Sequence, residues 1–550
     1  NRTFTERNND LFLNWNKYFG TDGELSFAGM LGYNQRRTSF QSISAATNGG
    51  LVVPGVYALS NSVAAPAAPG ETAYELGVDG LYGQASFGYK NFLYVDLTAR
   101  RDVSSTLPAG SNSFFYPSAT LSFIFSEFVD VDGFDFGKVR FNWANVGSDA
   151  PAQALVDAYG IGTPFNGVTL ASAPSTQNNA NLLPENTSSL EAGLEMKFLK
   201  NRAGLDLSVY QSSTFNQILP AQVSTATGTY FKYVNAGQID NNGVELSAYV
   251  TPVKTDDFQW DINVNWSRNR NNVVSLFGDS KTLLLASVQG GINVTARVGE
   301  AYGTIEGTSF VRDGATGAPL VYDWSSSRGG AIYHTGDIGV IGNIQADWRG
   351  GINNSFSYKN ITASALIDMQ MGGNFFSLDT WYGYGTGVYD FSAGTNADGN
   401  PIRSNIEDGG GLTWEEVGHL GIENVMQWDG VTMDADGNPV GTENTTKMWM
   451  NDYGNALGWA LAPNELHVYD ASFVKLREVA LTYRVPSSAL GELPIAGVDV
   501  SLIGRNLAIL YKNTPYSDPE AGLSAGNVQG YQSGAYPSLR EVGVNLRVKF

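Results

Sequence analysis

Strict alternation of apolar and polar residues, repeated along the whole chain, limits most strongly how this sequence can fold. In the last strand-like stretch every second residue from Val542 to Phe550 is apolar, and the residues between are polar or glycine. Because successive side chains of a β-strand point to opposite faces, a period of two predicts a strand with one apolar and one polar face. The stretches SLEAGLEMKFL (189–199) and FQWDINVNWS (258–267) repeat the pattern.

About fifteen such segments of nine to fifteen residues can be counted, a length typical of membrane-spanning strands. The connections between them alternate between short and long, as in outer-membrane barrels with short periplasmic turns and long outer loops. We therefore predict an all-β fold, a transmembrane antiparallel β-barrel with long extracellular loops. The expected turns are 20–23, 90–91, 127–137, 200–202, 253–257, 359–360 and 486–496. The expected loops are 35–79, 103–113, 148–188, 214–241, 270–342, 372–470 and 509–538.

Three of the short turns share the dipeptide Lys-Asn, at 90–91, 200–201 and 359–360. Asn tolerates the positive φ of tight hairpins, so the dipeptide fits a turn between two strands. If the last of fifteen strands runs inward, the first also runs inward, and residue 1 is expected on the outer side. The apolar faces are then expected to point to lipid.

Composition excludes several other classes. No apolar run approaches the roughly 18 residues that a membrane helix needs. The chain has no cysteine, which removes disulfide frameworks and thiol catalysis, and its net charge of −20 argues against nucleic acid as a partner. The polar start NRTFTERNND lacks the apolar core of a signal peptide, so we expect residue 1 to lie inside a longer protein.

Several stretches resemble the SusC/RagA-type TonB-dependent transporters, in the order found in that family and from residue 80 to the end. Two departures are Val103, where the family usually has glycine, and DPE directly after TPYS. The stretches are RRDVSS (100–105), FYPS (115–118), LLPENTSSLEAGLE (182–195), NAGQIDNNGVELS (235–247), YDASFVKLREVALTY (469–483), GRNLAIL (504–510), SDPE (517–520) and YPSLREVGVNLRVKF (536–550).

The resemblance implies a 22-stranded barrel, of which residues 1–550 would be the C-terminal part of one barrel domain, with seven strands and the plug outside this chain. It implies TonB-dependent import of an oligosaccharide or an oligopeptide across the outer membrane of a Gram-negative bacterium. The implied partners are TonB, a SusD-like outer-membrane lipoprotein that closes over the loops, and the lipid and lipopolysaccharide of the membrane. The terminal Phe550 resembles the signal by which such barrels are recognised for insertion, and it is expected at the inner rim.

Residues that could support an enzyme or a metal site are few. His334, His419 and His467 show no HxxxH or HxxE spacing, and neither a P-loop nor a G-x-S-x-G motif occurs, so we expect no enzyme and no zinc. Three acidic pieces supply oxygen ligands around a turn glycine without a complete twelve-residue calcium loop, so calcium stays an alternative to ordinary turn chemistry. These pieces are DVDGFD (130–135) and ADGNP at 397–401 and 435–439.

The expected loop 372–470 holds five of the eleven tryptophans. Aromatic faces stack on sugar rings and anchor protein interfaces, so this loop is a candidate contact for substrate or for the lid lipoprotein. A loop of this length also needs a core of its own, which some of these residues must supply. The candidate residues are Trp381, Tyr382, Trp414, Trp428, Trp449 and Trp459.

Two other functions fit parts of this pattern. A soluble or surface-attached β-rich adhesin would use the tryptophan loop as a carbohydrate-binding site, and it would bury its apolar strand faces between packed sheets. A passive porin would share the barrel but would lack the plug. Sequence alone does not choose between an oligosaccharide and an oligopeptide as the substrate.

Overall fold

A computed structural model describes residues 1–162, 164–323, 331–413, 415–416, 425–450, 457–491, 494–522 and 529–550. The chain divides into two compact units. Unit 1 contains residues 1–244 and 273–283, and unit 2 contains residues 245–272 and 284–550. None of the described helices is long and apolar enough to cross a membrane.

Unit 1 is built from long strands that follow one another along the sheet in chain order. From β1 to β13, each long strand pairs antiparallel with the next. The strands are β1 (Arg2–Phe19), β2 (Leu25–Ser44), β5 (Gly70–Tyr89), β6 (Leu93–Ser104), β7 (Ser113–Ile124), β8 (Phe134–Ser148), β12 (Glu185–Phe198), β13 (Ala203–Gln222) and the first part of β14 (Phe231–Lys254).

Unit 2 contains six further long strands, again paired antiparallel with their neighbours in chain order. Nine long strands in unit 1 and six in unit 2 confirm the predicted all-β class and the number of about fifteen. Their lengths reach 24 residues in β14, which is longer than expected. The strands of unit 2 are β15 (Phe258–Ser275), β22 (Trp348–Tyr358), β23 (Ile361–Met371), β28 (Phe473–Val485), β29 (Gly497–Lys512) and β31 (Glu541–Lys549).

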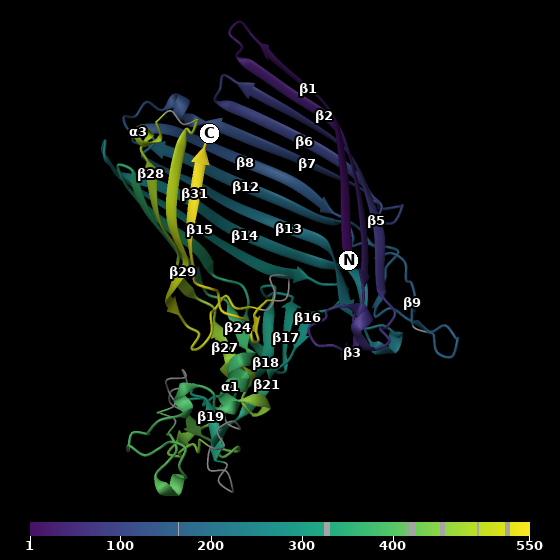
Figure 1. Ribbon diagram of the computed structural model, residues 1–550, viewed down its shortest axis with the longest axis vertical. Coiled ribbons are helices and arrows are strands. Elements are labelled where there is room, and N and C mark those ends of the chain that lie inside the picture. Colours follow the sequence, from purple (N-terminus) through teal and green to yellow (C-terminus); the bar gives the residue numbers. More distant parts are fainter. Residues whose placement is uncertain are drawn as a thin grey trace. The chain divides into compact units, whose positions relative to one another are not determined.

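The predicted segregation of short and long connections is present in unit 2 and only partly in unit 1, where connection 125–133 at the turn end is slightly longer than connections 105–112 and 223–230 at the loop end. In unit 1 the longer loops 45–69 and 149–184 carry the small strands β3 (Asn48–Leu51) and β9 (Gly160–Ile161), which lie at the same end of the sheet (Figure 1). In unit 2 the short helix α3 (Ser487–Leu490), between β28 and β29, lies at the opposite end from the long connections (Figure 1). Residue 1 is at the long-loop end of unit 1, as predicted, because β1 leads into the short turn 20–24.

Several loops are shorter than the sequence pattern predicted. The second connection covers residues 45–69 instead of 35–79, and the connection after β13 covers 223–230 instead of 214–241. Antiparallel pairing continues beyond the residues that alternate between apolar and polar. The reason is that the backbone hydrogen bonds of a ladder do not depend on which side chains the strands carry. Side-chain periodicity therefore marks only part of each strand.

The Lys-Asn turns adopt the left-handed backbone that the sequence predicted, with one difference. At 90–91 the two φ angles are 48° and 59°, and at 200–201 they are 58° and 59°. At 359–360 only Lys359 has a positive φ, of 50°. Lysine therefore adopts a positive φ in all three turns, whereas we predicted this conformation for asparagine alone.

The apolar faces of the long strands do not pack into a hydrophobic core. Val542 and Val544 on β31 are each 74% exposed, and Leu190 and Phe141 in unit 1 are 59% and 53% exposed. Three clusters of buried apolar side chains occur in the described part of the chain, and their buried members lie in the connections and the short strands within them. Two packed sheets would have buried the strand faces instead, so this pattern fits faces that meet lipid.

The long connections of unit 2 contain a folded structure that we call the outer module, made up of the described residues of 284–347, 372–472 and 513–540. It has two apolar cores of its own, one around Tyr384 and Leu457 and one around Phe376 and Ile305. Its elements include two small sheets, a pair of strands and helix α1 (Leu378–Thr386). One sheet contains β16 (Thr282–Val288), β17 (Ile292–Arg297), β18 (Thr304–Phe310) and β21 (Thr335–Asn343), and the other contains β24 (Asn374–Ser377), β27 (Val468–Asp470) and β30 (Tyr531–Gln532). The paired strands are β19 (Leu320–Asp323) and β25 (Met426–Gln427).

Aromatic rings lie flat on glycines of neighbouring strands in unit 1. A Cβ added to Gly32 would lie 2.3 Å from the ring of Tyr82, its partner across β2 and β5. A Cβ on Gly29 would lie equally close to the ring of Trp15 on β1. Glycine leaves the space that the ring occupies at these positions, which accounts for part of the high glycine content of the strands.

Candidate functional site in the outer module

Trp381 and Tyr382 lie on helix α1 of the outer module. The helix begins at Ser377, whose hydroxyl accepts a hydrogen bond from the backbone N–H of Thr380 and so satisfies one free donor of the first turn. Trp381 packs against the apolar core around Phe376. Tyr382 is 41% exposed, and its hydroxyl is hydrogen-bonded to the Gln289 side chain.

Trp459 lies beside the same helix. Its ring sits against Gly385, where an added Cβ would be 2.9 Å from the indole nitrogen. The residue is 42% exposed and has φ of 56°, an uncommon conformation for a bulky side chain. The structure therefore brings Trp381, Tyr382 and Trp459 together around α1, with Tyr382 and Trp459 open to solvent.

The other candidate tryptophans have different surroundings. Trp428, next to β25, donates its indole N–H to the carbonyl of Thr432 at 2.8 Å, and its ring contacts that of His334. Trp449 is half-buried between two methionines of the Tyr384 core. Trp414 lies outside the described residues. The six candidates do not form one continuous aromatic surface among the described residues, and Trp381 contributes to a core of the module.

His467 is buried at the centre of the module. Its Nδ1 is 3.1 Å from the Thr380 hydroxyl, and its ring packs against those of Phe376 and Tyr384. Burial lowers the pKa of His467 to about 3, so the ring is neutral at physiological pH. The described residues contain no group of three His, Cys, Asp or Glu side chains that could hold a metal ion.

The 372–470 part of the module is strongly acidic. It carries fifteen Asp or Glu residues against two Lys or Arg, a net charge of −13 out of −20 for the whole chain. At the ADGNP piece 435–439, Asp434 accepts hydrogen bonds from the backbone N–H groups of Asp436 and Asn438 at 2.9 and 2.8 Å. Such contacts satisfy the carboxylate oxygens by ordinary turn chemistry.

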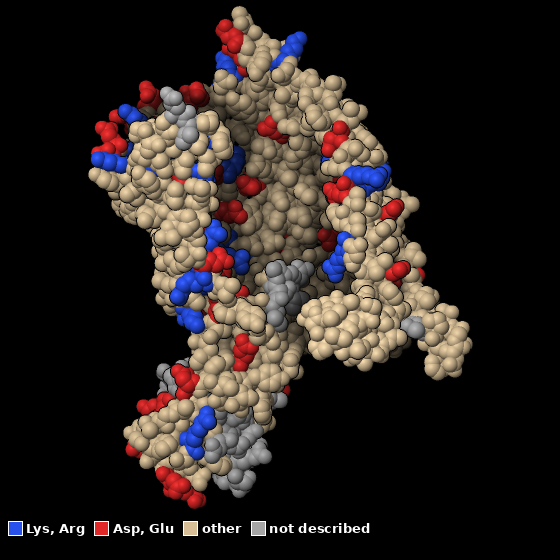
Figure 2. Space-filling model, in the orientation of Figure 1, with Lys and Arg blue, Asp and Glu red and all other residues tan. Residues whose placement is uncertain are grey.

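Charged side chains elsewhere are sparse. Figure 2 shows Lys, Arg, Asp and Glu as single residues or small groups separated by wide uncharged areas. In unit 1 they form ladders along the polar strand faces, where Arg140 on β8 reaches Asp206 at 2.8 Å and Ser208 at 2.6 Å on β13. The Arg100 and Asp102 side chains of RRDVSS form a second such pair at 2.8 Å.

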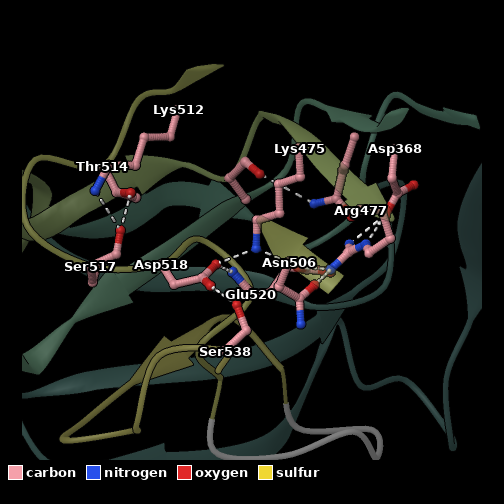
Figure 3. Close-up of polar contacts among 12 residues, drawn as sticks. Asp368, Lys475, Arg477, Asn506, Lys512, Thr514, Ser517, Asp518, Glu520 and Ser538 are labelled. Carbon is pink, nitrogen blue, oxygen red and sulfur yellow. Dashed lines mark hydrogen bonds and ion pairs between the residues drawn. The ribbon is translucent and has the colours of Figure 1, made fainter. Parts of the chain in front are cut away.

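A group of charged side chains joins β28 to the connection 513–540, and sequence reasoning did not find it (Figure 3). The Lys475 side chain is only 2% exposed, and its ammonium lies 2.6 Å from Asp518 and 2.5 Å from Glu520. Arg477, two residues along the strand, binds the same Glu520 at 2.9 Å and also pairs with Asp368 on β23. We call the five side chains the Lys475 cluster.

Neighbouring groups complete the hydrogen bonding of this cluster. Ser538 donates its hydroxyl to the Asp518 carboxylate, and Asn506 on β29 accepts from Arg477 at 3.1 Å. Burial raises the pKa of Asp518, but hydrogen bonds from Lys475 and Ser538 outweigh it and lower the pKa to about 2. The carboxylate is therefore charged, as the buried ammonium requires.

The signal for this cluster was present in the stretches that carried the family resemblance. KLRE (475–478), SDPE (517–520) and SLRE (538–541) place charged residues at strand ends, and the fold brings three of these pieces together. Nothing in the sequence indicates this contact, because Lys475 and Asp518 are 43 positions apart along the chain.

Comparison with known proteins identifies the family. The sequence profile described as "TonB dependent receptor-like, beta-barrel" matches residues 1–289, more than half of the chain. The chain belongs to this family. Members of the TonB-dependent receptor family are outer-membrane β-barrels, and the matched relatives are receptors and transporters, not enzymes. The resemblance noted in the sequence, the barrel class and the absence of an enzyme are thereby confirmed.

Two curated relatives cover different shares of this TonB-dependent receptor chain. TonB-dependent receptor P26 of Formosa agariphila is 27% identical over 503 residues, covering 85% of this chain and 46% of that protein. TonB-dependent receptor SusC of Bacteroides thetaiotaomicron is 25% identical over 302 residues, covering 52% of this chain and 30% of that protein. The chain spans about half the length of the P26, P3 and P39 receptors that it matches.

A solved structure described as the RagAB peptide transporter has the same fold. It superposes with a TM-score of 0.72 at 15% sequence identity, covering all of this chain and 56% of that chain. Identity at this level supports the barrel fold and does not extend to the substrate.

Proposed function

We propose that this TonB-dependent receptor chain is the barrel part of a nutrient importer in the outer membrane of a Gram-negative bacterium. The substrate is an oligomer, either an oligosaccharide or an oligopeptide. Residues 1–550 belong to one barrel domain, and TonB acts through a plug that lies outside these residues. Family membership together with the exposed apolar strand faces carries the proposal.

A SusD-like lipoprotein is the proposed partner at the outer side. The similarity to SusC and to the RagAB transporter supports this partner, and the outer module offers it a folded surface. Tyr382 and Trp459 are the candidate contacts for the lid or for arriving substrate, because both are exposed aromatic residues beside α1. The proposal retains Trp414, Trp428 and Trp449 as secondary candidates, and Phe550 as the barrel-assembly signal.

Phe550 is positioned suitably for that signal. It follows β31, whose last residue Lys549 pairs with Gly497 beside the short turn 486–496, and it is 91% exposed. The short-turn end is the proposed periplasmic side, so the side chain is accessible to assembly machinery there.

Uptake measured in a deletion strain tests the proposal. Complementation with the intact gene should restore growth on the cognate oligomer, and loss of TonB should abolish uptake while the barrel stays in the membrane. Uptake that persists without TonB would indicate a passive porin instead. A protein that partitions into the aqueous phase and shows no change in electrophoretic mobility on boiling would indicate the adhesin alternative.

Removal of residues 395–465 tests the part played by the outer module. The deletion takes away most of the Tyr384 core but none of the long strands, which end at Met371 and resume at Phe473. Barrel assembly should stay intact, because a shorter connection can still join the two strands. Uptake or lid binding should fall, and normal import with the partner retained would show that the segment only covers the barrel.

A further inference from the structure

The Lys475 cluster joins the connection 513–540 to β28 through a buried ion pair. Lys475 and Asp518 are 2% and 3% exposed, so neither ion can be solvated by bulk water while the contact exists. The Lys475 ammonium pairs with Asp518 and with Glu520, and the second partner of Glu520 is Arg477. A buried ion that loses its partner is left with a large desolvation penalty, so this contact resists partial opening.

The same connection binds the 372–470 part of the outer module at two further points. Before the cluster, Tyr516 stacks on Tyr389 with ring centroids 3.8 Å apart and planes inclined by 4°. After the cluster, β30 pairs in parallel with β24, and the backbone N–H of Gly534 donates to Asp379 on α1 at 2.7 Å. Gln532 adds hydrogen bonds to Ser377 and Asp379.

These contacts give the described residues of this connection, 513–522 and 529–540, the arrangement of a strap. Asp518 and Glu520 bind it to β28. Before and after these two residues along the chain, it contacts helix α1 or the residues around that helix. We propose that the Lys475 cluster is an ionic latch, which holds the strap against the strands of unit 2 and thereby fixes the position of α1, which carries the exposed Tyr382 and lies against Trp459. The latch is a positioning device, and it does not depend on which substrate or partner the module meets.

Hydrogen exchange followed by mass spectrometry on the chain in detergent micelles tests this inference. Lys475→Met keeps the aliphatic stem and removes the charge, leaving Asp518 buried without the ammonium that it pairs with. Exchange should rise about tenfold or more in peptides covering 513–522 and 529–540, and in peptides covering α1, because a local unit that loses its anchor opens more often. Peptides from β8 and β12 of unit 1 should not change.

Arg505→Gln is the matched control. It breaks the Arg505–Glu478 ion pair, which joins the same two strands β28 and β29 at 2.9 Å but is largely exposed and lies outside the cluster. Exposed pairs contribute little, so this variant should exchange like the wild type throughout. A comparable rise in exchange with Arg505→Gln would overturn the latch, because loss of an exposed charge on the neighbouring strand β29 would then suffice.

Two further outcomes decide the rest of the inference. Faster exchange in 513–540 with unchanged α1 would overturn the strap, and unchanged exchange in both would overturn the latch itself. If Lys475→Met fails to assemble a heat-modifiable barrel, Glu520→Gln replaces it, since Glu520 is partly exposed and its loss leaves the Lys475–Asp518 pair in place. That variant should raise exchange in the strap and in α1 by about threefold, and wild-type exchange would again overturn the latch.

Discussion

The outer connections of the two units are stabilised in different ways. In unit 1, residues 38–70 and 158–184 contain no Asp, Glu, Lys or Arg, and they display apolar side chains at their tips. Tyr57 is 91% exposed there, Phe165 is 69% exposed, and the side-chain amide of Asn61 holds the tip by hydrogen bonds to Val53 and Val56. In unit 2, the 372–470 segment carries a net charge of −13 and contributes many buried apolar residues to the cores of the outer module.

The difference shows that length decides how a loop is stabilised. The connections of unit 1 are short enough to be held by strand ends, hydrogen-bonded turns and one small cluster around Leu182. The connections of unit 2 are long enough to fold against each other, and their acidic surface keeps that folded part solvated.

The largest effect is expected from cutting a core side chain of the outer module. Phe376→Ala removes a fully buried ring, and such changes destabilise by about 3 to 5 kcal/mol. Phe165→Ala, at an exposed tip of unit 1, should change local stability by less than about 0.5 kcal/mol. Protease sensitivity and hydrogen exchange of the two regions measure both effects, and similar losses at the two sites would contradict independent cores.

A charge placed on an apolar strand face should have the next largest effect, and it should be the same in both units. Val264→Arg or Leu194→Arg should cost about 2 to 4 kcal/mol if the site is near the middle of the bilayer, and Asn263→Arg should be mild. Glu195 is a poor control because it pairs with Lys138 at 2.8 Å and Lys197 at 3.1 Å. Unfolding from lipid vesicles in denaturant measures the cost, and equal effects on both faces would indicate two packed sheets.

Acid should loosen the outer module and leave loop 45–69 of unit 1 unaffected. The pKa of His467 is lowered to about 3 in the folded module, below the unfolded value, so unfolded chain takes up the proton first. The contribution of the neutral His467 ring to the free energy of unfolding is complete above about pH 6.5. Below that pH it falls by roughly 1.4 kcal/mol per pH unit. Burial also lowers the pKa of His334, so this residue changes the stability of the module with pH in the same direction.

Loop 45–69 has no acidic, basic or histidine side chain, so its exchange should show no such pH dependence once intrinsic exchange rates are corrected. His467→Gln should flatten the profile of the module between pH 5 and about 6.5. Constant corrected protection of the wild-type module over that pH range would show that protons reach His467 without opening of the module.

The smallest effect is expected from removing calcium. The Asp434 carboxylate is already satisfied by its own turn, so EDTA should leave the protection of both outer regions unchanged. Ligands that bind only the folded state stabilise it, so added calcium would raise protection if a site exists. A rise confined to peptides around 130–135, 397–401 or 435–439 would identify which acidic piece binds.

The strand pattern could be read from the sequence because each long strand has one face that avoids water. The same reasoning failed at strand ends such as Ser44 and Gly70, where pairing continues without an apolar face. It also missed the small strands of the outer module, which are two to nine residues long and carry no clear period. The Lys475 cluster was out of reach because its residues come from three separate segments, and single charges in a sequence do not reveal their partners.

The glycines beneath aromatic rings have a consequence for how this sequence can evolve. Gly32 cannot gain a side chain while Tyr82 covers it, and Tyr82 rests flat only because Gly32 has none. The two positions are therefore coupled, so that a change tolerated at one depends on what occupies the other. Among homologous barrels, such pairs should be replaced in concert, and their correlated substitution would record which strands are neighbours.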